Sequence, residues 1–150
     1  MIKQAFEFLK ENYEVSFATC EDNKPKIRVF QIMKFGDKDL FFATSPKKAV
    51  FKQLHENPFI EIMAFKGKIS VKCVGQAHFD VDDKTKQWIF DNNPVLPRLY
   101  EDYKGLEYFR MEIESIDYYD LQLTPPILKH INLSTLEEKD GFVGDRYSKQ

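Results

Sequence analysis

The 150-residue sequence predicts a mainly β fold, an antiparallel barrel or sandwich of six strands with three helices among them. Two observations support this class. Six segments carry strand-like patterns and follow one another without the strand–helix–strand alternation of a doubly wound sheet. Fourteen Phe and seven Tyr against a single Trp favour strands around a core of flat side chains. The length suits one domain, and the sequence has no internal repeat.

The first half is expected to open with a short amphipathic helix over residues 2–11. Four apolar side chains share one face of that helix: Ile2, Ala5, Phe6 and Leu9. Three strands follow as an antiparallel meander over residues 14–20, 26–35 and 40–43, with turn-forming residues between them.

The second half is expected to begin with a helix from Pro46 to about His55, followed by a strand pair over residues 59–65 and 69–78. Asp82 can cap a third helix, which ends near Asn93. A long strand over residues 108–121 buries one face, and a polar tail with one short strand near residues 130–133 comes last.

The second strand is apolar on both faces. Ile27, Val29 and Met33 point to one side, and Phe30 and Ile32 point to the other. One face can fill a barrel, so the other needs a cover, either helices or a second subunit.

Charge and hydropathy exclude several classes. The net charge is −2, which argues against a nucleic-acid or membrane-surface protein. No segment is long and apolar enough to span a membrane, and residues 1–7 lack the apolar run of a signal peptide, so we expect a cytoplasmic protein. Charge is nevertheless uneven, because residues 23–52 hold eight basic and two acidic side chains.

Metal and nucleophile chemistry find no support in the sequence. Cys20 and Cys73 lie far apart in strand-like segments, where thiols act as small apolar groups. The three histidines, His55, His78 and His130, have no Cys, Asp or Glu partner at metal or triad spacing, so no metal site is expected.

The segment Thr44–Lys48 predicts an anion site. Ser45 suits an N-cap and Pro46 the first helical position, which would place Lys47 and Lys48 in the first turn. Cations there are disfavoured by about 0.3–1 kcal/mol each unless an anion such as phosphate binds the turn. The alternative, that both lysines are ordinary solvated side chains, stays open.

The order of these segments resembles the pyridoxamine 5'-phosphate oxidase-like FMN-binding split barrels. The likeness covers about residues 5–121 and includes Arg28–Gln31, Leu40–Thr44, Lys47–Lys48 and Gly75–Ala77. The resemblance implies a split barrel over residues 1–124, with residues 125–150 as a tail packed on the same domain. It also implies a homodimer with FMN at the interface.

The resemblance further implies which residues bind the cofactor: Arg28, Val29, Phe30, Gln31, Phe42, Ala43, Thr44, Ser45, Lys47, Lys48, Lys68 and Ser70. Arg28, Lys47 and Lys48 would hold the phosphate, and Lys68 and Ser70 would reach the cofactor from the other subunit. The sequence departs from the family at Met33 and Ser70, where a lysine or polar residue and a nearby glutamine are usual.

Within the family the sequence is most similar to the nitroimidazole-resistance and general-stress branch, because the Arg-x-His pair of the vitamin oxidases is missing from its C-terminal end. That branch implies reduction of a small aromatic or nitroaromatic acceptor with NAD(P)H. The alternative is a non-catalytic flavin- or haem-binding stress-response protein, and a deazaflavin cofactor also stays open.

The segment between the predicted strands over residues 69–78 and 108–121 is a helical insert. Three of its aromatic residues are candidates for a substrate pocket: Trp88, Tyr100 and Tyr103. For Trp88 the competing interpretation is that it packs its helix on the barrel. A further alternative is an oligonucleotide-binding barrel that stacks bases on Phe30, Phe41 and Phe42, although the net charge opposes it.

Overall fold

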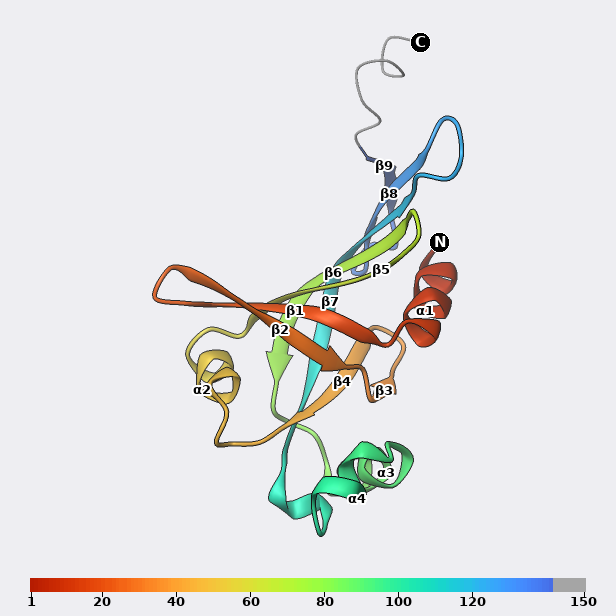
Figure 1. Cartoon of the computed structure of the whole chain (residues 1–150). Coiled ribbons are helices and arrows are strands. Elements are labelled where there is room, and N and C mark those ends of the chain that lie inside the picture. The colour runs from red at the N-terminus through yellow and green to blue at the C-terminus, as the bar shows by residue number, and fades with distance from the viewer. Residues whose placement is uncertain (142–150) are drawn as a thin grey trace.

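One antiparallel sheet of nine strands forms the body of the computed structural model, which describes residues 1–141 (Figure 1). The elements in chain order are α1 (Ile2–Glu11), β1 (Glu14–Glu21), β2 (Lys24–Gln31), β3 (Lys34–Phe35), β4 (Asp39–Thr44), α2 (Ala49–Glu56), β5 (Phe59–Lys66), β6 (Ile69–His78), α3 (Asp83–Asn92), α4 (Val95–Leu99), η1 (Tyr103–Gly105), β7 (Glu107–Asp120), β8 (Ile127–Asn132) and β9 (Glu138–Asp140).

The sheet curls into a barrel because its two edge strands are consecutive in the chain. The strand order is β2-β1-β5-β6-β7-β4-β3, and only Ile32 and Met33 separate β2 from β3. The Ile32 amide donates to the Tyr13 carbonyl at 2.8 Å, and the Met33 amide donates to the Phe41 carbonyl at 2.9 Å. The mainly β fold of the sequence analysis is therefore confirmed.

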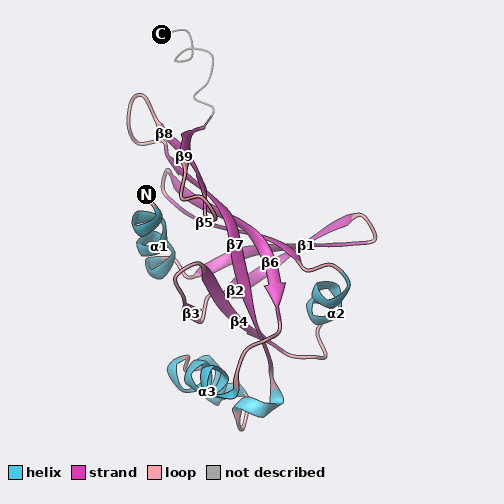
Figure 2. Cartoon of the chain, turned by 180° about the vertical axis from the view of Figure 1, so that it is seen from behind, coloured by secondary structure: helices cyan, strands magenta, loops and turns pink. Residues whose placement is uncertain are grey.

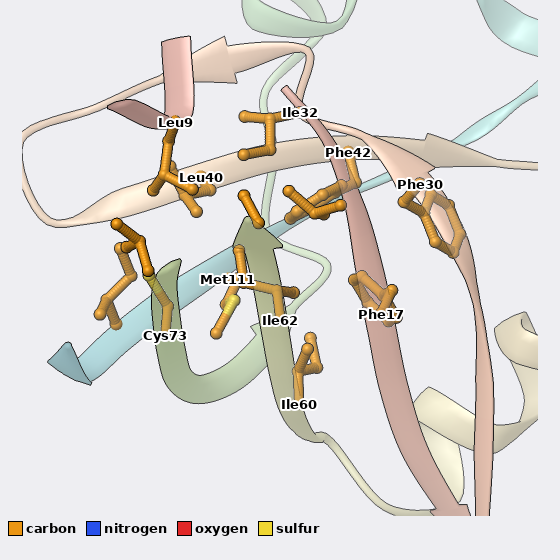
Figure 3. Close-up of a cluster of buried hydrophobic side chains, with 14 of the residues drawn as sticks. Leu9, Phe17, Phe30, Ile32, Leu40, Phe42, Ile60, Ile62, Cys73 and Met111 are labelled. Atoms are coloured by element: carbon orange, nitrogen blue, oxygen red, sulfur yellow. The ribbon is translucent and has the colours of Figure 1, made fainter. Parts of the chain in front are cut away.

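Aromatic and aliphatic side chains together fill the barrel, among them Phe17, Ile62 and Met111 (Figure 3). The Phe17 and Phe30 ring centroids lie 4.5 Å apart, and Phe42 stacks on Phe109 with centroids 5.4 Å apart. Each of these side chains is buried, and burial of one such ring stabilises the fold by about 1.5–3 kcal/mol. Helix α1 closes one end of the barrel, where Leu9 joins the same cluster.

The strand predictions hold in pattern but not in number. The described residues contain nine strands, not six, because the predicted strand over 26–35 divides into β2 and β3 and because β8 and β9 were incompletely foreseen. The predicted strand is divided because the chain crosses between two neighbours at Ile32 and Met33. The Ile32 amide donates to Tyr13, just before β1, whereas the Met33 amide donates to Phe41 of β4. Within the tail, β8 pairs with residues 115–120 of β7, and residues 142–150 lie outside the described part.

The predicted start of the second helix is wrong. Helix α2 begins at Ala49, with Lys48 as its N-cap, and the preceding residues form a turn in which the Lys48 amide donates to the Ser45 carbonyl at 3.1 Å. Pro46 suits the second position of such a turn as well as it suits a first helical turn. The Ser45 hydroxyl accepts from the Lys47 amide at 3.2 Å, so it caps this turn and not the helix.

The insert between β6 and β7 carries α3, α4 and η1 and lies against the barrel through a second apolar cluster. Asp82 accepts a 2.7 Å hydrogen bond from the Thr85 amide, which confirms the predicted cap of α3. The Asn93 amide group donates to the Met33 carbonyl at 3.0 Å and ties the end of α3 to the link between β2 and β3. Figure 2 shows the helices placed around the sheet.

No helix among residues 1–141 covers the outer face of β2 and β5. Ile27 is 73% exposed, Val29 69% and Phe65 72%. The sequence predicted that either helices or a second subunit would cover this face, and the described helices do not. None of the helices among residues 1–141 has the length and apolarity to cross a bilayer.

Candidate functional site

A cleft of about 210 Å³ opens where β2, β4, α2 and α4 meet. Four of its lining residues are polar: Arg28, Gln31, Thr44 and Lys48. The rest of the wall is mainly apolar, with residues from β2, β4, α2 and the insert: Val29, Phe30, Met33, Ala43, Val50, Val95, Leu96, Leu99, Tyr100 and Leu106. A cleft with two positive charges and a mainly apolar wall suits a flat molecule with an anionic tail.

Arg28 is half-buried and keeps its charge. It sits on the inner face of β2, where its Nη1 donates to the Thr19 hydroxyl at 2.8 Å and its Nη2 donates to Gln53 Oε1 at 2.7 Å. Burial lowers the pKa of Arg28, yet a guanidinium stays protonated in proteins. Among residues 1–141 no carboxylate lies within 4.0 Å of it.

Lys48 stands at the start of α2, where backbone amides point outward. No side chain caps this end of the helix, and the first turn holds no acidic residue. The helix dipole and the exposed amides favour an anion here. Within the described residues the Lys48 ammonium group forms no ion pair, so its charge too is uncompensated.

Thr44 carries a buried polar group without a partner. It ends β4, lines the cleft and is 3% exposed, and its hydroxyl Oγ1 has no hydrogen-bond partner among residues 1–141. A buried unpaired hydroxyl costs about 1–3 kcal/mol, so such groups are uncommon without a functional reason.

The structure brings together most of the predicted cofactor residues. Seven of the twelve line the cleft: Arg28, Val29, Phe30, Gln31, Ala43, Thr44 and Lys48. Phe42 does not line the cleft, and its ring is fully buried in the core. Ser45 and Lys47 occupy the turn beside the cleft without lining it.

Lys68 and Ser70 lie far from this cleft in the same chain. Both belong to the turn region between β5 and β6, which Figure 1 shows at the opposite end of the molecule from α3 and α4. Neither residue lines the cleft.

The three aromatic candidates for the substrate pocket occupy different positions. Tyr100 lines the cleft, whereas Trp88 and Tyr103 do not. Trp88 is 45% exposed, and the ammonium group of Lys34 in β3 lies 5.1 Å from its ring centroid. Ile89 and Phe90 are buried in the second apolar cluster.

The oligonucleotide alternative fails on burial. Phe30 and Phe42 are 9% and 0% exposed and pack against each other's rings inside the barrel, so neither offers a free face to a base.

Two residues at the site escaped the sequence analysis. Thr19 and Gln53 are buried and hydrogen-bonded to each other at 2.7 Å beside Arg28. Gln53 lies three residues from Val50 on the buried face of α2, a place where a polar side chain signals a specific partner. The partner itself could not be identified, since β1, β2 and α2 meet only in the folded chain.

Known proteins match the chain along most of its length. The family model described as pyridoxamine 5'-phosphate oxidase matches residues 1–118. A pyridoxine/pyridoxamine 5'-phosphate oxidase of Psychrobacter cryohalolentis is 36% identical over 64 residues, which cover 42% of this chain and 30% of that protein. The match to this curated relative thus spans less than a third of its length.

Solved structures share the fold. A NimC/NimA family protein from Clostridium acetobutylicum is 25% identical with a TM-score of 0.65, covering 79% of this chain and 82% of that one. A protein from the same organism, related to general stress protein 26 of B. subtilis, is 16% identical with a TM-score of 0.74 over 91% and 96% of the two chains.

A pyridoxamine 5'-phosphate oxidase-related, FMN-binding protein from Nostoc punctiforme is 14% identical with a TM-score of 0.65, covering 95% of each chain. Together with the family match over residues 1–118 and the closed antiparallel sheet, these findings identify the family. The chain belongs to the pyridoxamine 5'-phosphate oxidase family.

Proposed function

We propose that this chain binds FMN in the cleft and uses it as an oxidoreductase for a small aromatic or nitroaromatic acceptor. The observation that carries the proposal is the buried, unpartnered Thr44 hydroxyl beside two uncompensated cations, Arg28 and Lys48. Phosphate oxygens accept from all three groups. The family match and the FMN-binding relative from Nostoc punctiforme support the choice of FMN.

The apolar wall of the cleft suits the flavin ring. Leu96 and Leu99 of α4, with Tyr100 just after it, offer a surface against which a flat ring can pack, while Arg28 and Lys48 orient the molecule by its tail. Bound FMN would supply the transfer of electrons, and the protein groups would position it.

A second copy of the chain is needed to complete the site. Pockets that enclose a small molecule measure about 300–1,000 Å³, whereas this cleft measures about 210 Å³. We expect a homodimer in which the exposed Ile27, Val29 and Phe65 are covered. Lys68 and Ser70 would then approach the partner's cleft.

The chemistry of the wall indicates an uncharged acceptor. Apart from Arg28 and Lys48, the lining carries no charged side chain. A nitroaromatic or quinone-like compound fits this environment. NAD(P)H is the proposed electron source, and the cytoplasmic location stays a prediction.

A carrier or sensor without its own chemistry is the second candidate. Its support is that the lining residues include no His, Cys, Asp or Glu that could donate a proton to a substrate.

The test begins with the purified protein. A yellow preparation that releases FMN on denaturation, followed by steady turnover of a nitroaromatic acceptor with NADH or NADPH, supports the oxidoreductase. A holoprotein that binds FMN yet turns over no acceptor leaves the carrier, and a haem Soret band in place of the flavin spectrum refutes FMN as the cofactor.

A further inference from the structure

The guanidinium of Arg28 is held by two neutral oxygens that hydrogen-bond to each other. The Thr19 hydroxyl accepts from Nη1 at 2.8 Å, and Gln53 Oε1 accepts from Nη2 at 2.7 Å. The same Thr19 hydroxyl donates to Gln53 Oε1 at 2.7 Å. Both residues are buried, with exposures of 5% and 4%.

This pair occupies the place that a carboxylate usually takes. Arginine commonly meets Asp or Glu through two parallel hydrogen bonds across its Nη1 and Nη2 end. Here two separate oxygens, one from β1 and one from α2, accept from the same two nitrogens, Nη1 and Nη2. A carboxylate would cancel the charge of Arg28, and the neutral pair does not.

The rest of the guanidinium stays available. Nη1 donates both of its hydrogens, one to Thr19 and one to the Phe17 carbonyl at 3.3 Å. Nη2 donates one hydrogen to Gln53. In the described structure the Nε hydrogen and the second Nη2 hydrogen have no acceptor, and two such donors on a cleft-lining arginine suit the oxygens of a phosphate.

We infer that Thr19 and Gln53 are positioning residues that fix Arg28 while leaving its full charge for an anion in the cleft. They thereby set a preference for phosphorylated over unphosphorylated flavin. The inference rests on the proposed FMN site, and it adds the residues that determine how strongly that site selects the phosphate.

Gln53→Glu tests this directly, because it keeps the shape and the accepting oxygen of the side chain and adds one negative charge. Beside Arg28 the new carboxylate remains ionised. A unit charge about 6 Å from a phosphate, at an effective dielectric constant of about 20, weakens its binding by about a hundredfold. Riboflavin, which lacks the phosphate, should bind Gln53→Glu within about threefold of its wild-type affinity.

The measurement is a fluorescence titration of the full-length apoprotein with FMN and, separately, with riboflavin. Gln4→Glu is the matched control, because it makes the same change in net charge at an exposed position of α1. It should leave both affinities unchanged. Gln53→Met, which removes the accepting oxygen without adding charge, should weaken FMN about tenfold and riboflavin little.

The outcomes separate the two levels of the proposal. If the wild-type chain prefers FMN and both Gln53 variants keep that preference in full, the positioning role is refuted while the FMN site stands. If the wild-type chain binds FMN and riboflavin equally, or binds neither, the phosphate anchor fails and the inference fails with it. Should Gln53→Glu not fold, the FMN-to-riboflavin ratio of Gln53→Met decides.

Discussion

Replacement of Thr44 by Val should raise the stability of the apoprotein and lower its affinity for FMN. Val has nearly the shape of Thr and suits a strand equally well, so β4 should be unchanged. The wild-type hydroxyl is 3% exposed and has no partner, which costs about 1–3 kcal/mol. Thr44→Val removes that cost from the folded state. In the proposed FMN complex the Thr44 hydroxyl would donate to a charged oxygen. Such a bond contributes about 1.5–3 kcal/mol, so Thr44→Val should bind FMN about tenfold to a hundredfold more weakly.

Urea unfolding of the FMN-free protein gives its free energy of unfolding, and a fluorescence titration with FMN gives its affinity for the cofactor. Thr19→Val is the matched control: its hydroxyl is equally buried but bonded to Arg28 and Gln53, so its loss should destabilise the apoprotein by about 1–3 kcal/mol. If Thr44→Val destabilises the apoprotein as Thr19→Val does, the hydroxyl has a protein partner. If it leaves FMN affinity intact, Thr44 does not touch the cofactor.

Three other predictions concern the interface, the barrel and a thiol. Val29→Asp places a charge on the exposed outer face and should convert the proposed dimer to a monomer, as measured by light scattering. A dimer of unchanged mass would show that the interface lies elsewhere. Gly75→Ala puts a Cβ 2.0 Å from a carbonyl oxygen of β7 and should lower the free energy of unfolding, measured in urea, by several kcal/mol. Gly105→Ala is the control: a Cβ there meets open space, so the free energy of unfolding should change by less than about 0.5 kcal/mol. Burial raises the pKa of the Cys73 thiol to about 12, so as pH rises the unfolded chain loses this proton before the folded chain does. The free energy of unfolding should therefore fall above about pH 9, by about 1.4 kcal/mol per pH unit. Cys73→Ala should reduce this pH dependence.

Periodicity predicted the parts of the fold that depend on local sequence. The alternation of Phe109, Met111 and Ile113 with charged residues gave β7 its buried face, and Asp82 marked the start of α3. The start of α2 was missed because Pro46 suits both a helix and a turn, and the hydrogen bond from Lys48 to Ser45 selects the turn.

The site was predictable only in its charges and in its likeness to a family. Arg28 and Lys48 could be named from the sequence, as could Thr44, because each belongs to a short recognisable segment. The pair of Thr19 and Gln53 could not be named, since their contact joins residues 34 positions apart and depends on how α2 packs on β1. The order of strands in the sheet likewise depends on pairing between strands far apart in the chain, such as β1 with β5 and β4 with β7.

The central claim is that a flavin phosphate binds between Arg28, Thr44 and Lys48. A crystal structure of the protein grown with excess FMN tests it most directly. We expect phosphate oxygens within hydrogen-bonding distance of the Arg28 guanidinium and the Thr44 hydroxyl, with the ring against α4. An FMN molecule bound elsewhere, or a Thr44 hydroxyl that stays unpartnered while FMN is bound, would contradict the account.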